Sequence, residues 1–165
     1  MVSVARRATS KLLQMMNAPD GLNTNIAELA QAENVSLAPV PVARFFTDNV
    51  ASDVAEKVVD VKYTAVYVYC AKIVNDLKET FRTFSGRLQM EIDVRVSQDR
   101  LEGIDRTSQL YTDAVTQILN HNRGDWGQGL FYAGGYEISF GPVKHGGRNF
   151  IKSATVSFQV DASLD

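Results

Sequence analysis

The sequence predicts an α+β fold: a mostly antiparallel β-sheet packed by one long helix at about residues 101–122, with one or two N-terminal helices. Three patterns predict it. Residues 88–97 alternate strictly between apolar and polar side chains, which is typical of a half-buried strand. Residues 101–122 repeat their apolar side chains at helical spacing. Residues 130–140 and 150–160 alternate again on either side of a glycine-rich turn, as the strands of a hairpin do.

The first helix is expected from about residue 4, because four apolar side chains follow one stripe of a helix: Val4, Ala8, Leu12 and Met15. The basic residues here, with no acid before Asp20, also resemble a transit peptide. A secretory signal needs an unbroken apolar stretch, and Lys11 and Gln14 interrupt this one. An amphipathic helix is therefore favoured, and the sequence Pro-Asp-Gly at 19–21 should end it.

A second short helix is expected next, with Asn25 as its cap and Glu28 completing a capping box. Two prolines near residue 40 then forbid helix and favour extended backbone. Residues 43–47 are expected to form a strand. Residues 48–60 fit either a helix or an exposed loop, and both interpretations stay open.

Residues 63–74 are rich in β-branched and aromatic side chains on both sides, which predicts a central strand covered on both faces. Cys70 lies in this run and is expected to be a core residue with a raised thiol pKa, not a nucleophile. Gly134 and Gly135 suggest a bulge or a close backbone approach in the first strand of the last hairpin. We expect a single domain over residues 1–165, with N-terminal helices at about 4–33 and the sheet and long helix at about 42–160.

The composition is that of an ordinary globular protein: 45 % apolar and 22 % charged residues, with a net charge of −2. A charge so close to zero argues against a dedicated nucleic-acid binder. One cysteine excludes an intramolecular disulfide framework and any multi-cysteine metal site. No segment approaches the roughly 18 consecutive apolar residues of a membrane span.

The sequence contains no phosphate-binding glycine loop and no nucleophile elbow, so it predicts no catalytic residue, no metal site and no cofactor. The two histidines, His121 and His145, lie beside turn residues and are expected to be solvated. Glu91 and Asp93 point to the same side of their strand, which is the geometry of a paired acid–base site. Because Arg95 follows on that face, we expect a charged solvent face with a local ion pair.

Charge is distributed unevenly along the chain. Residues 1–19 carry three basic side chains and no acid, and residues 141–152 are also basic, whereas residues 48–60 carry four acids against one lysine, a sum of −3. Separate patches of opposite sign can associate head to tail and close into a ring, although scatter on a solvated surface gives the same pattern. Trp126, in a glycine-rich segment, is either an aromatic anchor on a flexible arm or a cap of the core. The candidate interface residues are Trp126, Phe131, Lys144, Arg148, Lys152, Asp53 and Glu56.

The order of elements resembles the tail-terminator and neck proteins of tailed bacteriophages: an N-terminal helix, a hairpin-rich middle, one long helix near residue 110 and a closing hairpin (135–143, then 150–160). The resemblance spans about residues 4–160 and rests on length, element order and the residue pattern of the last hairpin. It implies a non-enzymatic virion protein, assembled in the host cytoplasm, that forms a ring, commonly a hexamer. Its partners would be its own copies, the tail tube protein and the head–tail connector protein, with DNA only as the passing genome and no membrane.

Alternatives from other classes stay open, including another assembly or adaptor protein. One is a small hydrolase or ligand-binding domain with a site between the long helix and the sheet, using His121 and Asp125. Another is a single-stranded nucleic-acid platform. Its stacking rings would be Tyr67, Tyr69, Tyr132 and Tyr136, with Arg148 and Lys152 nearby.

Overall fold

The computed structural model describes residues 3–50, 64–146 and 149–165. In this part of the chain three α-helices, one 3-10 turn and an eight-stranded sheet are present. The helices are α1 (Val4–Met16), α2 (Leu22–Ala32) and α4 (Ile104–His121), and the 3-10 turn is η1 (Val42–Arg44). The strands are β1 (Phe45–Phe46), β2 (Ala65–Asn75), β3 (Phe84–Gln98), β4 (Gly124–Gly127), β5 (Leu130–Tyr132), β6 (Glu137–Phe140), β7 (Lys144–Gly146) and β8 (Asn149–Leu164).

The sheet has the order β1-β2-β3-β8-β5-β4, and β6 and β7 also pair with β8. Every pairing is antiparallel except that of β1 with β2. The predicted α+β class with a mostly antiparallel sheet is therefore confirmed. The predicted strand at 43–47 shrinks to Phe45–Phe46, because a 3-10 turn occupies the residues directly before it.

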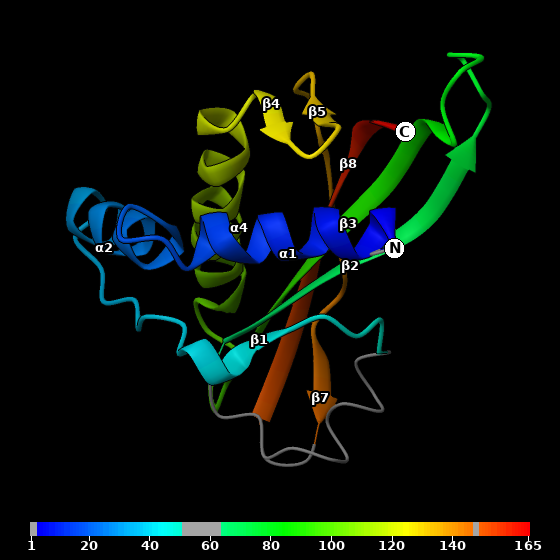
Figure 1. Cartoon of the computed structure of the whole chain (residues 1–165). Helices are drawn as coiled ribbons and strands as arrows, with labels where there is room; N and C mark the ends of the chain where they lie inside the picture. The colour runs from blue at the N-terminus through cyan, green and yellow to red at the C-terminus, as the bar shows by residue number, and fades with distance from the viewer. Residues whose placement is uncertain (1–2, 51–63, 147–148) are drawn as a thin grey trace.

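The helices lie on one face of the sheet (Figure 1), and α4 shares that face with α1, so the sheet is not packed by one helix alone. Ser3 caps α1 by accepting a hydrogen bond from the amide of Arg6 at 3.2 Å. Ala8, Leu12 and Met16 then point into the core, with Met16 in the place expected for Met15. None of the helices that the structure describes is both long and apolar enough to cross a bilayer.

The predicted cap of the second helix is wrong. The helix begins at Leu22 after Gly21, where a Cβ would lie 2.3 Å from the carbonyl oxygen of Met16. Asn25 instead lies inside the helix, is buried, and donates its side-chain amide to the carbonyl of Ala114 at 3.2 Å. Asn25, which resembles a helix cap in the sequence, therefore links α2 to α4 by a hydrogen bond.

The apolar face of residues 88–97 is confirmed, because every apolar side chain of this run of β3 is buried beneath the helices. The half-buried strand is wrong at its second half, because Asp93, Arg95 and Ser97 are buried too. Val156, Phe158 and Val160 of β8 continue the apolar layer across the sheet. The two strands pair without a break from Phe84↔Leu164 to Gln98↔Phe150. Together they are the centre of the fold.

The closing hairpin is confirmed through the antiparallel pairing of β6 with β8. The expected bulge is wrong: Gly134 and Gly135 lie between β5 and β6, with φ of +102° and +86°. The sequence did not predict the β4–β5 hairpin, whose turn places Gln128 and Gly129 at positive φ. Of the ambiguous segment 48–60, residues 48–50 have no regular structure and residues 51–60 lie outside the described ranges.

Candidate interaction surface

Residues 71–87 project from the body of the molecule as an arm (Figure 1). The arm consists of the end of β2, the connection 76–83 and the start of β3, and the last residues of β8 brace it on one side. It begins at a β-bulge between Cys70 and Lys72, which increases the local twist of a strand. Residues 71–73 and 75 of β2 are exposed, in contrast to its buried first half.

The turn at the end of the arm is held by hydrogen bonds rather than by apolar packing. The side-chain amide of Asn75 donates to the carbonyl of Thr83 at 3.2 Å, and its oxygen accepts from the amide of Ser85 at 3.1 Å. The hydroxyl of Ser85 accepts from the amide of Glu79 at 3.1 Å. The Glu79 carboxylate in turn accepts from Arg82 Nε at 3.1 Å, and Arg82 also pairs with Asp165. The tip therefore has a defined conformation.

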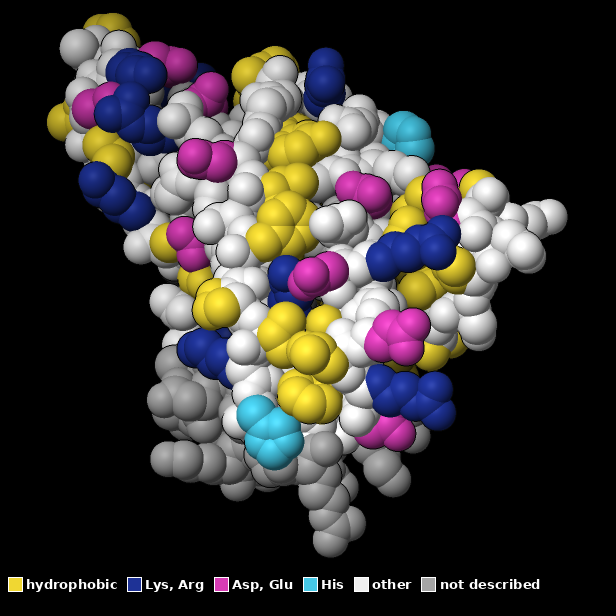
Figure 2. Space-filling view, turned by 180° about the vertical axis from the view of Figure 1, so that it is seen from behind, with side chains coloured by type: hydrophobic (Ala, Val, Ile, Leu, Met, Phe, Trp, Pro, Cys, Tyr) yellow, Lys and Arg dark blue, Asp and Glu magenta, His cyan; other side chains and the backbone are white. Residues whose placement is uncertain are grey.

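Two large apolar side chains of this polar turn are exposed to solvent. Phe81 is 98 % exposed and Leu77 is 53 % exposed. Leu77 also adopts φ +48°, a left-handed backbone that costs a leucine energy. Figure 2 shows the arm at the upper left, with hydrophobic side chains near its end among charged ones. Exposed apolar side chains on an ordered turn make the tip a candidate contact site for a partner.

Gly86 is required where the arm leaves the sheet. A Cβ at this position would lie 1.9 Å from the carbonyl oxygen of Val74 on the paired strand. No rotamer relieves a clash with backbone, so only glycine permits this close approach of β2 and β3.

The helix-free face of the sheet carries a polar network. The Tyr69 hydroxyl donates to Glu91 Oε2 at 2.7 Å and lies 3.2 Å from Asp93 Oδ2. Asp93 also accepts from the Thr155 hydroxyl at 2.8 Å and pairs with Arg95 Nη2 at 3.4 Å. Burial, together with the two carboxylates, raises the pKa of Tyr69 far above its ordinary value. The expected ion pair is present, but Asp93 and Arg95 are buried, so the expected solvent face is wrong at these two residues.

Aromatic stacking and one backbone contact cover Arg95. Its guanidinium lies 3.9 Å above the Tyr67 ring, and Phe46 stacks on Tyr67 at 4.8 Å. Arg95 also donates to the carbonyl of Val50. Its Nε and Nη1 have no hydrogen-bond partner among the described residues. The network therefore links β2, β3 and β8 to one another and to the segment that ends at Val50.

Of the predicted interface residues, the structure describes Trp126, Phe131, Lys144 and Lys152. Trp126 is buried against Tyr132 and Phe158 and donates its indole N–H to the carbonyl of Asn122 at 2.6 Å, so it is part of the core and not an anchor. Phe131 is 48 % exposed, and Lys144 is exposed on β7. Lys152 pairs with Asp105 within the chain at 2.5 Å. Arg148, Asp53 and Glu56 lie outside the described residues.

Of the residues of the alternative functions, His121 ends α4 and Asp125 lies on β4. His121 and Asp125 are exposed, and the Asp125 carboxylate accepts from the amide of Gly127 at 2.7 Å, as a turn residue does. The stacking platform is wrong for three of its four rings, because Tyr67, Tyr69 and Tyr132 are buried. Their apolar bodies already pack inside the fold.

Cys70 is only half-buried and packs at the margin of the core, so its expected core position is partly correct. Burial raises the pKa of its thiol, as expected for an unreactive cysteine. Within the described ranges, no group of three or more His, Cys, Asp or Glu residues is placed to hold a metal ion.

Two of the surface hollows lie at the helix ends and at the base of the arm. One, of about 260 Å³, lies between the end of α1 and the end of α4 and is lined in part by Met15 and Ile118. The other, of about 280 Å³, lies at the base of the arm beside Gly86 and Phe131. The first hollow is also lined by Lys11, Asp20 and His121, and the second by Lys78, Glu79 and Asp161.

No protein-family model matches the chain, and no curated protein matches it in sequence. The candidate site is thus defined by its own geometry: an ordered arm that presents exposed apolar side chains.

Proposed function

We propose that this chain is a structural subunit of a ring that closes the tail tube of a bacteriophage and joins it to the head connector. The observation that carries the proposal is the arm, whose hydrogen-bonded tip holds Phe81 and Leu77 in solvent. A single copy gains nothing from this arrangement, because exposed apolar area stabilises a protein only when a partner covers it. The resemblance in size and element order supplies the tail-terminator assignment.

Self-assembly is tested by electron microscopy of the purified full chain. We expect rings of uniform size with an opening wide enough to pass duplex DNA. Monomers or compact dimers at every concentration would contradict the proposal.

The bacteriophage assignment has a separate test in the genome. The gene is expected to lie beside genes for tail tube, sheath or tape-measure proteins. A neighbourhood without any tail or head gene would remove the assignment and leave self-assembly to be judged by microscopy.

A further inference from the structure

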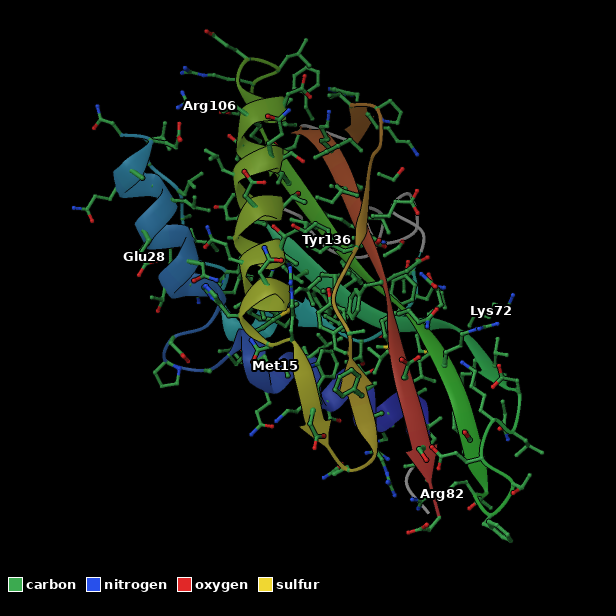
Figure 3. All side chains as sticks on the ribbon, turned by 90° about the horizontal axis from the view of Figure 1, so that it is seen from above. Met15, Glu28, Lys72, Arg82, Arg106 and Tyr136 are labelled. Carbon is green, nitrogen blue, oxygen red and sulfur yellow. The ribbon has the colours of Figure 1, made fainter. Side chains whose placement is uncertain are left out.

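We draw no further inference here: the strongest candidate, the exposed apolar tip of the arm beside Arg82 (Figure 3), carries none because nothing in the described part of the chain shows what covers its Phe81 and Leu77 side chains.

Discussion

At the scale of single residues, the buried Asp93–Arg95 pair is the most sensitive point of the helix-free face. Asp93→Ala leaves the Arg95 charge buried with no carboxylate beside it. We expect the free energy of unfolding to fall by about 3–5 kcal/mol, measured by urea denaturation. The double variant Asp93→Ala/Arg95→Met should lose less, because it removes the stranded charge. A loss below about 1 kcal/mol in the single variant would show that the pair behaves as an exposed one.

Tyr69 gives a prediction on pH. Its pKa is raised in the folded state, so the folded chain keeps a proton that the unfolded chain releases above about pH 10. The stabilisation is complete below that pH and declines above it, by at most about 1.4 kcal/mol per pH unit. Urea denaturation from pH 9 to 11 should therefore show a steeper decline for the wild type than for Tyr69→Phe. Parallel curves would contradict this, and Tyr136→Phe, in an exposed ring, is the control.

At the scale of elements, Asn75 holds the arm by bonding both Thr83 and Ser85. We expect Asn75→Ala to speed amide hydrogen exchange in residues 76–86, with little change in the amides of α4, because the lost bonds are local. Asp76→Ala is the neighbouring control. Unchanged exchange in the arm would mean that the β8 brace alone keeps it ordered.

The β4–β5 hairpin carries one buried aromatic side chain, Trp126, and one half-exposed one, Phe131. Trp126→Ala should lower the free energy of unfolding by about 3–5 kcal/mol, because it empties a site packed by Tyr132 and Phe158. Phe131→Ala, on the same hairpin, should cost far less because its ring is half exposed. Thermal or urea denaturation of the two variants side by side decides the matter, and equal losses would contradict the assignment.

The elements also show what local sequence can predict. The buried stripe of β3 follows from alternation alone, because one strand carries the whole pattern. The burial of Arg95 does not, because the Val50 carbonyl and the Phe46 ring on this face lie 45 and 49 positions before it in the chain. Trp126 was ambiguous for the same reason: its neighbours Tyr132 and Phe158 meet only once β5 pairs with β8.

The arm was not predicted, since its sequence continues the patterns of β2 and β3. Only the structure shows that these strands extend past the helices. Phe81 therefore resembles any other aromatic in a polar turn until its exposure is known. The glycine at position 86 was the one available sign, because a glycine inside a strand indicates close backbone approach.

At the scale of the whole molecule, the structure weakens the expectation that separate patches of opposite charge hold copies of the chain together. Of the basic residues expected to meet a neighbour, Lys152 already pairs with Asp105. The proposed assembly depends instead on the apolar side chains of the arm. The free energy of burying apolar side chains is largely independent of salt. If the chain forms a ring as proposed, we expect the tip to supply most of the free energy of the contact between copies.

Native mass spectrometry of the full chain tests this claim most directly, with Phe81→Asp compared against the wild type. Because Phe81 is exposed, the substitution should leave the fold and the melting temperature unchanged. Val42→Asp, at another exposed apolar residue, is the matched control. We predict one closed oligomer for the wild type and for Val42→Asp, six copies being the number that the family resemblance implies, and monomers for Phe81→Asp. A monomeric wild type, or a Phe81→Asp variant that forms the same oligomer, would contradict the account.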